Sequence, residues 1–227
     1  MSELEQMIDE SRYGDAPLGA RLLQLKNKID KAYPEFASAM GAFVDRLENA
    51  RAGINVPQVG EQMPNFMLPN ENGHLVSLET LLMDSPVVIT FHRGHWCPYC
   101  RLSVESLART APKLKTAQLI AISGEKPQYS RILKAEANAD FPMLTDIELG
   151  YTLSLNLAIW IDNATAEYIM GSGYDIATYQ GSPSWILPIP AVFAVSQDGV
   201  IRARHVDPDY RRRIDMEDIL DMARELG

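Results

Sequence analysis

The 227-residue chain is poor in cysteine and lacks long apolar runs and an excess of positive charge. Its two cysteines are too few for the disulfide scaffold of a small secreted protein. Apolar runs such as 87–91 and 191–195 are far shorter than the roughly 20 residues that span a bilayer, which excludes a transmembrane helix. The first ten residues are acidic and do not resemble a secretory signal, so we expect a cytoplasmic protein.

Acidic side chains outnumber basic ones, 30 to 21, and give a net charge of −9. A chain with this charge repels nucleic-acid phosphates and anionic lipids, so we expect neither a nucleic-acid nor a membrane partner. The one basic run, Arg211-Arg212-Arg213, lies among acidic residues and predicts a solvated, charge-mixed turn. With 46% hydrophobic residues, the chain has enough apolar side chains to form the core of a soluble domain.

Both cysteines, Cys97 and Cys100, lie in one C-x-x-C motif that follows the apolar run 87–91. That run is typical of a buried strand, whereas the apolar residues from Cys100 onward recur at helical spacing. Pro98 favours a helix start there, because its fixed φ suits the first helical position. The motif is therefore predicted at a junction between a strand and a helix spanning 98–115.

This position predicts redox chemistry. A helix N-terminus stabilises negative charge, so we expect a lowered pKa for Cys97 and assign it as the nucleophile. Cys100 lies one turn further along the same helical face, where it can close a disulfide with Cys97 as the resolving thiol. His95 is interpreted either as a positive charge beside the thiolate or as a surface histidine.

A metal site is the alternative for the same stretch. His92, His95, Cys97 and Cys100 supply four donors, but their spacing is not a familiar ligand pattern and the chain has no second C-x-x-C. We therefore expect neither a metal nor another cofactor.

Residues 1–52 are predicted to form an N-terminal helical extension. Apolar residues recur at helical spacing from Pro17 to Arg51, and Pro34 should break or kink this helix. Such a stripe usually means burial, so the extension is interpreted as a packing or dimerisation element, with a homodimer as one possibility.

Residues 53–227 show strands alternating with helices, which predicts an α/β fold with a sheet covered on both faces. Residues 158–185, rich in loop signals, are interpreted as an insertion within this domain. Pro190 follows Pro188 and comes directly before the strand 191–195, which makes it a candidate cis-proline.

Two patterns together resemble a known fold. Trp96-Cys97-Pro98-Tyr99-Cys100 after a buried strand, with Ile189-Pro190 before a later one, resembles the thioredoxin fold, in which a cis-proline loop lies against the dithiol. The longer pattern resembles the AhpC/TSA, or peroxiredoxin-like, family from about Val59 to Asp209. The matching pieces are VGEQMPNF at 59–66, NGHLVSL at 72–78, FHRGHWCPYC at 91–100 and PAVFAVSQDGVI at 190–201.

The resemblance implies a thioredoxin-like α/β fold with a central mixed sheet flanked by helices. It also implies that Cys97 is the peroxidatic cysteine, that Cys100 resolves its sulfenic acid as a disulfide, and that a thioredoxin-type dithiol reduces the disulfide. The substrate would be a hydroperoxide. A thioredoxin-like oxidoreductase acting on protein disulfides is the alternative, and a redox-sensing module in which the disulfide changes the docking of the helical extension is a second one.

Two positions depart from the family pattern. Gly94 stands where peroxiredoxins usually carry Thr or Ser, and Pro190 aligns with a position that usually holds Arg. Arg93 or Arg101 could replace the missing charge. Arg101 is otherwise interpreted as an exposed helical residue.

Overall fold

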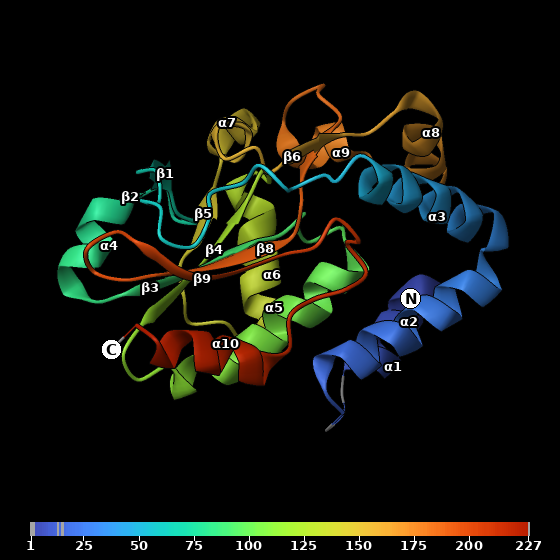
Figure 1. The fold of residues 1–227 in the computed structure, drawn as a ribbon. Helices are drawn as coiled ribbons and strands as arrows, with labels where there is room; N and C mark the ends of the chain where they lie inside the picture. The colour runs from blue at the N-terminus through green and yellow to red at the C-terminus, as the bar shows by residue number, and fades with distance from the viewer. Residues whose placement is uncertain (1–2, 13, 15, 227) are drawn as a thin grey trace.

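A computed structural model describes residues 3–12, 14 and 16–226. Its centre is a five-stranded sheet in the order β5-β4-β3-β8-β9 (Figure 1). β3 is parallel to β4 and antiparallel to β8, so the sheet is mixed and the predicted thioredoxin-like α/β fold is confirmed. The strands are β3 (Val87–Phe91), β4 (Gln118–Ser123), β5 (Met143–Thr145), β8 (Ala191–Val195) and β9 (Ile201–Val206).

Both faces of the sheet are covered. Side chains alternate along β3, so Val88 packs on one face, while Ile89 and Phe91 pack on the other. The Val88 face is covered by three helices: α5 (Pro98–Thr110), α6 (Pro127–Ala137) and α10 (Met216–Arg224). The Phe91 face is covered by residues from 56–68 and from the turn containing α7 (Gly150–Ser154).

A hairpin lies beside the sheet, as the turn-rich spacer 69–73 predicts. It pairs β1 (Met67–Pro69) with β2 (Leu75–Ser77). The Asn70 carboxamide oxygen accepts hydrogen bonds from the backbone N–H groups of Asn72 and His74, at 2.9 and 3.0 Å, which shapes the turn. α4 (Leu78–Asp84) follows directly.

Residues 158–185, interpreted as an insertion, contain two short helices between paired strands. β6 (Ala158–Trp160) pairs antiparallel with β7 (Ile186–Pro188), and between them lie α8 (Asn163–Gly171) and α9 (Ile176–Gln180). Asp162 caps α8 by accepting a 2.9 Å hydrogen bond from the backbone N–H of Thr165. This fixes where α8 begins.

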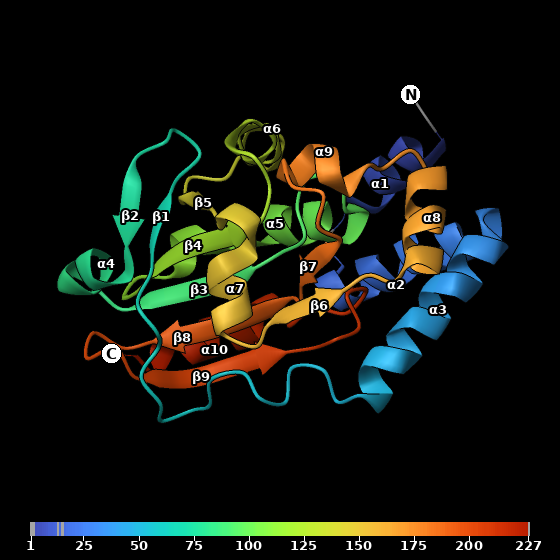
Figure 2. The ribbon, with the colours of Figure 1, turned by 90° about the horizontal axis from the view of Figure 1, so that it is seen from above.

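The N-terminal extension consists of α1 (Glu3–Arg12), α2 (Leu18–Ala32) and α3 (Pro34–Asn49). The predicted break at Pro34 is confirmed, since α2 ends at Ala32 and Pro34 opens α3. α1 and α2 pack against α5, whereas α3 packs against α8 (Figure 2). The apolar stripe on α2 and α3 is thus buried within the chain itself: Leu18, Leu22, Leu25, Ile29, Met40, Phe43 and Val44.

Buried charges hold the extension on the main domain. The Arg21 guanidinium donates to the Glu105 carboxylate of α5 at 3.1 Å and also to the Ser106 hydroxyl. Both members of the Arg21–Glu105 pair are nearly inaccessible. Glu105 also pairs with Arg109 of the same helix, so the buried carboxylate is balanced by two guanidinium groups.

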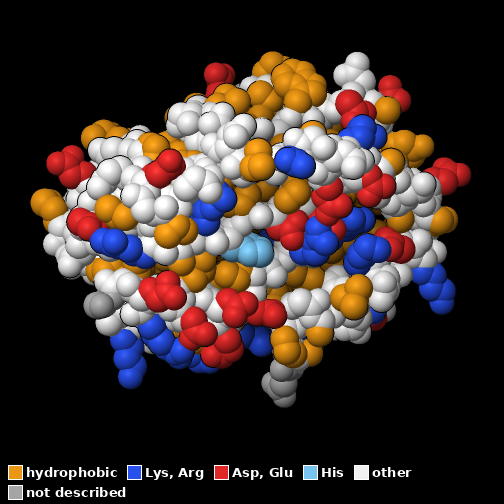
Figure 3. Space-filling model, in the orientation of Figure 1, with side chains coloured by type: hydrophobic (Ala, Val, Ile, Leu, Met, Phe, Trp, Pro, Cys, Tyr) orange, Lys and Arg blue, Asp and Glu red, His pale blue; other side chains and the backbone are white. Residues whose placement is uncertain are grey.

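Acidic and basic side chains intermingle on the face of the molecule shown in Figure 3. Among the described residues, no helix combines the length and apolarity needed to cross a membrane.

Candidate functional site

The topology of the sheet brings distant segments to one edge. β3 and β4 are parallel, and β9 runs in the same direction because two antiparallel pairings separate it from β3. The C-terminal ends of these three strands therefore lie on the same edge, where β8 begins. The loop that carries Cys97, the residues after β4 and the loop after β9 meet there.

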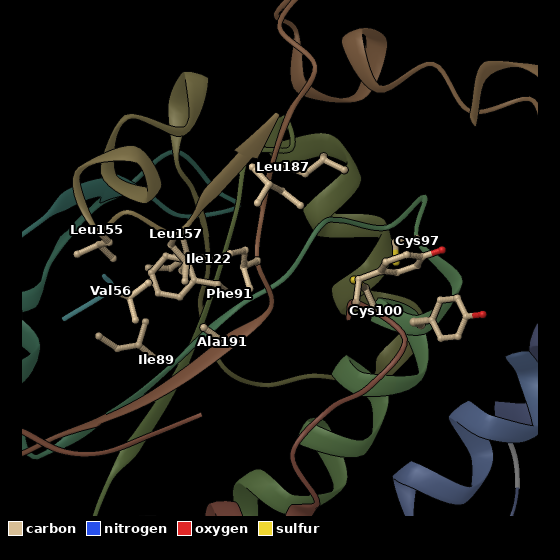
Figure 4. Packing of buried hydrophobic residues seen from close by; sticks show 14 of the residues in the cluster. Val56, Ile89, Phe91, Cys97, Cys100, Ile122, Leu155, Leu157, Leu187 and Ala191 are labelled. Carbon is tan, nitrogen blue, oxygen red and sulfur yellow. The ribbon is translucent and has the colours of Figure 1, made fainter. Parts of the chain in front are cut away.

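Cys97 and Cys100 lie where the sequence predicts, at the beginning of α5. Cys97 is the N-cap residue and Pro98 opens the helix. The Cys97 carbonyl accepts hydrogen bonds from the backbone N–H groups of Cys100 and Arg101, at 3.0 and 3.1 Å. Figure 4 shows both cysteines at this helix end, apart from the aliphatic side chains around Phe91. Both thiols are free and buried.

Cys100 has the surroundings of a thiolate. Its Sγ accepts a hydrogen bond from the backbone N–H of Arg93 at 3.3 Å and one from Arg213 Nη2 at 3.4 Å. Burial opposes the charge, but a hydrogen bond from Cys97 together with Arg213, His92 and the Arg93 N–H lowers the pKa of Cys100 well below its ordinary value. In this arrangement, these hydrogen bonds favour a thiolate at Cys100.

The predicted lowering of the Cys97 pKa is wrong for this arrangement. Complete burial raises the pKa of Cys97 well above its ordinary value, and its hydrogen bond to Cys100 raises it further. The Cys97 side chain makes no capping hydrogen bond to α5. The helix start was placed correctly, but burial outweighs its electrostatic effect.

Cys97 lines a cavity of about 340 Å³, whereas Cys100 is not among the lining residues. The cavity is lined by four parts of the chain: the N-terminal extension, the segment 169–174, the motif itself and Tyr210 in the loop after β9. Arg93 contributes to the wall beside Cys97, and its guanidinium carbon lies 4.1 Å from the centre of the Tyr210 ring.

Arg93 is 3% exposed, and its Nε and Nη2 donors have no hydrogen-bond partner among the described residues. Its positive charge acts on Cys97 and lowers the pKa of that thiol, although less than burial raises it. Arg93 thus lines the cavity that reaches Cys97, while its Nε and Nη2 atoms are themselves buried.

Arg101 and His95 are directed elsewhere. Arg101 is buried, so the interpretation as an exposed helical residue is wrong. Its guanidinium pairs with Glu5 at 2.8 Å and with Glu136 at 3.2 Å. His95 Nε2 lies 3.2 Å from Glu136 Oε1. Arg101 therefore connects α1, α5 and α6, and His95 joins the same cluster.

Pro190 lies at the start of β8, on the same sheet edge as the dithiol. The register pairs Phe91 with Ala191, which places Pro190 beside the residue that follows β3. The prediction of a cis peptide bond is wrong: the described residues contain none. Trp96 is buried, lines the cavity and lies with its ring centre 6.3 Å from that of Tyr174.

Gly94 explains how the motif accommodates a buried carboxyl group. Its φ is +129°, and a Cβ placed there would lie 2.2 Å from the carboxyl carbon of Glu125, just after β4. Glu125 is fully buried, and burial raises its pKa to about 8. The backbone N–H groups of His95 and Trp96 lower the pKa of Glu125, although neither forms a well-aligned hydrogen bond to its carboxyl group. The absence of a side chain at position 94 thus leaves the space that the Glu125 carboxyl group occupies.

The donors proposed for a metal do not converge. His95 pairs with Glu136, and both ring nitrogens of buried His92 are without a hydrogen-bond partner in the described chain. The described residues contain no group of three or more His, Cys, Asp or Glu side chains arranged to hold a metal ion.

Sequence reasoning missed Arg213, Tyr210 and Glu125. Arg213 belongs to the basic run that predicted a solvated turn; this holds for exposed Arg212 but is wrong for Arg213, which reaches Cys100. Tyr210 lies in the same loop, and no local signal marks it. Glu125 follows Gly124, just after an apolar run. A charged residue directly beyond a predicted buried strand is the sequence signal that could have identified it.

Comparison with known proteins agrees with this fold. The chain is similar to peroxidoxin BcpB from Mycobacterium tuberculosis, at 17% identity and a TM-score of 0.55, covering 75% of this chain and 98% of that one. It is also similar to reduced Prx3 from Vibrio vulnificus, solved in complex with H2O2, at 16% identity and a TM-score of 0.59, covering 74% and 99%. A search of curated proteins found no match.

A family model adds the decisive match. The AhpC/TSA model covers residues 59–204 and so includes the dithiol motif, β8 and most of β9, but not α1–α3. Membership supports an enzyme that is a thiol peroxidase or a thiol–disulfide oxidoreductase. The chain belongs to the AhpC/TSA family.

Proposed function

We propose that the protein is a peroxiredoxin-like thiol peroxidase with Cys97 as the nucleophile. In the first step, the Cys97 proton moves to the Cys100 thiolate, and the Cys97 sulfur attacks the terminal peroxide oxygen. The O–O bond breaks, Cys97 becomes a sulfenic acid, and the leaving alkoxide takes up a proton to become an alcohol. The sulfur is oxidised by two electrons and the peroxide is reduced by two.

Cys100 then completes the oxidative half of the cycle. Its sulfur attacks the Cys97 sulfenic acid, forms the S–S bond and releases water. An external dithiol of the thioredoxin type restores both thiols and leaves as its own disulfide. Within this scheme, the positive charge of Arg93 in the cavity wall stabilises the negative charge that develops on the peroxide oxygens beside Cys97.

The observation that carries the proposal is the different access to the two sulfurs. Cys97 lines the 340 Å³ cavity together with Arg93, whereas Cys100 is fully buried and accepts hydrogen bonds from Arg93 and Arg213. A small oxidant that enters the cavity meets Cys97 first. Cys100 is held within one helical turn, ready for the second step.

Stopped-flow oxidation of the reduced protein tests this proposal. We expect peroxide to oxidise Cys97 much faster than a free thiol, and a sulfenic acid trapped by dimedone should accumulate in the Cys100→Ser variant but not in Cys97→Ser. If peroxide reacts no faster than with a free thiol while insulin disulfides are reduced, the alternative of a protein dithiol–disulfide oxidoreductase is correct.

The remaining assignments are also proposals. We treat 1–52 as an extension of a domain that spans 53–227 with an insertion near 158–185. A homodimer through the extension would have to use the outer faces of its helices, because their apolar stripe is buried within the chain.

A redox-sensing role requires the extension to loosen on disulfide formation. Equal hydrogen exchange of α1–α3 in oxidised and reduced protein would exclude that role. A cytoplasmic location stays a prediction.

A further inference from the structure

Glu125, just after β4, is a buried acid that the proposed cycle does not use. Its side chain is inaccessible, and neither carboxyl oxygen has a hydrogen-bond partner among the described residues. Burial without a partner disfavours a charged carboxylate, which raises the pKa of Glu125 to about 8, so the group is mostly protonated at pH 7. The interior of the molecule therefore holds a carboxyl proton close to the dithiol motif.

The loop between β3 and α5 contacts both Glu125 and Cys100. Gly94 leaves space for the Glu125 carboxyl group, since a Cβ there would lie 2.2 Å from the carboxyl carbon. The preceding residue, Arg93, donates its backbone N–H to Cys100 Sγ at 3.3 Å. Neighbouring residues of one short loop thus connect the two acidic groups.

The charges of Glu125 and Cys100 oppose each other. Burial is the main cause of the raised Glu125 pKa, and the negative charge of Cys100 raises it further. Water screens this repulsion weakly, because both side chains are fully buried. A negative charge on one group therefore disfavours a negative charge on the other.

Other titratable groups at this site are not acids near pH 7. Tyr179 of α9 faces Glu125, and burial together with the Glu125 charge raises the pKa of its phenol. His92 lies near Cys100, and burial lowers the pKa of its imidazole, so we expect it to be neutral. Glu125 is thus the group that can give up a proton when the charge of Cys100 disappears.

The proposed cycle requires one proton that the two cysteines do not supply. The reduced site holds a Cys97 proton beside the Cys100 thiolate, and hydrogen peroxide brings two more hydrogen atoms. The two water molecules formed together with the disulfide contain four. One proton must therefore come from another group, while the negative charge of Cys100 is lost from the interior.

We propose that Glu125 supplies this proton, so that its carboxyl group ionises when the disulfide forms and is protonated again when the dithiol is restored. During oxidation, the S–S bond forms, the O–O bond breaks, and two electrons pass from the sulfurs to the peroxide. During reduction, an external dithiol gives two electrons and two protons, one proton to Cys97 and one to Glu125, and leaves as its own disulfide. Negative charge moves between Cys100 and Glu125, and the net charge of the buried site stays constant.

This inference rests on the redox-active dithiol of the proposed function but not on which oxidant reacts with it. Glu125 does not line the cavity at Cys97, so it acts on the proton balance of the dithiol and not on the peroxide itself.

The pH dependence of the equilibrium with dithiothreitol tests the coupling. Near pH 7.5, the equilibrium constant for reduction of the wild-type disulfide should change less than about threefold per pH unit, because Glu125 takes up the proton left over. In Glu125→Gln this proton is released, so the constant should rise about tenfold per pH unit. Tenfold slopes in both proteins would overturn the proposal. Flat slopes in both would also overturn it, because another group, such as His92, would then take the proton.

Glu71→Gln is the matched control. Glu71 is also a buried glutamate, but its carboxylate pairs with Lys134 at 2.6 Å, so it stays ionised in both redox states. This variant should show the weak pH dependence of the wild type. A tenfold slope in Glu71→Gln as well would show that the effect is not specific to Glu125 and would overturn the proposal.

Infrared difference spectroscopy of the wild type gives a second measurement that does not depend on a variant. At pH 7.5, the C=O stretching band of a protonated carboxylic acid should be present in the reduced protein and lost on oxidation. The same band should be missing from reduced Glu125→Gln. A band that persists after oxidation would overturn the proposal.

This inference and the proposed function fail in different ways. A weak pH dependence that becomes tenfold in Glu125→Gln, together with slow oxidation by peroxide, would refute the peroxidase and still support the role of Glu125. Absence of a Cys97–Cys100 disulfide from the oxidised protein, measured by mass spectrometry, would refute both.

Discussion

Arg213 Nη2 lies 3.4 Å from Cys100 Sγ, although 113 residues separate the two in the chain. This contact brings the loop after β9 against the dithiol. It places the positive charge of Arg213 beside the sulfur of Cys100, which does not line the cavity. Together with the Arg93 N–H, it distinguishes the two cysteines electrostatically.

Replacing Arg213 should therefore raise the pKa of Cys100. Arg213→Met removes both the hydrogen bond and the charge that lower this pKa, so the thiolate should form only at higher pH. The ultraviolet absorbance of the thiolate, followed against pH in the Cys97→Ser background, measures the change. Arg212→Met is the matched control, because Arg212 pairs with Asp207 and Glu48. Equal titration curves for the two variants would show that Arg213 does not stabilise the thiolate.

Gly94→Ala should destabilise the protein by about 2–5 kcal/mol, because it combines a positive φ with a collision against Glu125. Gly60→Ala is the control: Gly60 also has a positive φ, +91°, but open space around it, so a loss of only about 1–2 kcal/mol is expected. Urea unfolding measures both variants. Equal losses would mean that the Glu125 carboxyl does not occupy the space beside Gly94.

Glu125 should make stability depend on pH. Its folded pKa of about 8 exceeds the ordinary value of 4.5, so the folded state binds more protons between these values and stability falls as pH rises through that interval. Glu125→Gln removes this dependence. The free energy of unfolding of the wild type relative to the variant should fall between pH 5 and 8 by on the order of a few kcal/mol. A constant difference across this range would contradict a raised pKa.

Arg21→Met should cost about 1–3 kcal/mol of stability, because buried Glu105 loses one of its two cationic partners and keeps only Arg109. Lys28→Met on the same helix removes the pair with Glu10, which is much more accessible, and should cost less than about 1 kcal/mol. Thermal or urea unfolding of the two variants gives the comparison. Similar small losses would show that the Arg21 pair does not hold the extension in place.

Much of the fold could be predicted from sequence, because its signals are local. An apolar run followed by C-P-Y-C predicts a strand, a helix start and the position of both cysteines, and Pro34 predicts the break between α2 and α3. Contacts between distant segments could not be predicted in the same way. In the sequence, Arg213 is one member of a charged run. It reaches Cys100 only because the C-terminal ends of β3 and β9 lie on the same side of the sheet.

The expected pKa of Cys97 was wrong for a related reason. The helix start is a local feature, but burial of the thiol depends on the whole environment of the site, including the cavity to which the N-terminal extension contributes. Arg101 likewise reads as a surface residue until α1 and α6 supply its carboxylate partners. Sequence patterns therefore predict the position of the dithiol in the fold, while its electrostatics depend on long-range packing.

The near-complete burial of both sulfurs has a consequence for the timing of the catalytic cycle. A small oxidant can enter the closed molecule, but a protein reductant must bring its own sulfur into bonding distance of the Cys97–Cys100 disulfide. In the proposed cycle, each reduction by a protein dithiol therefore requires the residues that cover the two sulfurs to move aside and return. With a protein reductant, the frequency of this opening sets an upper limit on turnover, however fast the O–O bond is broken.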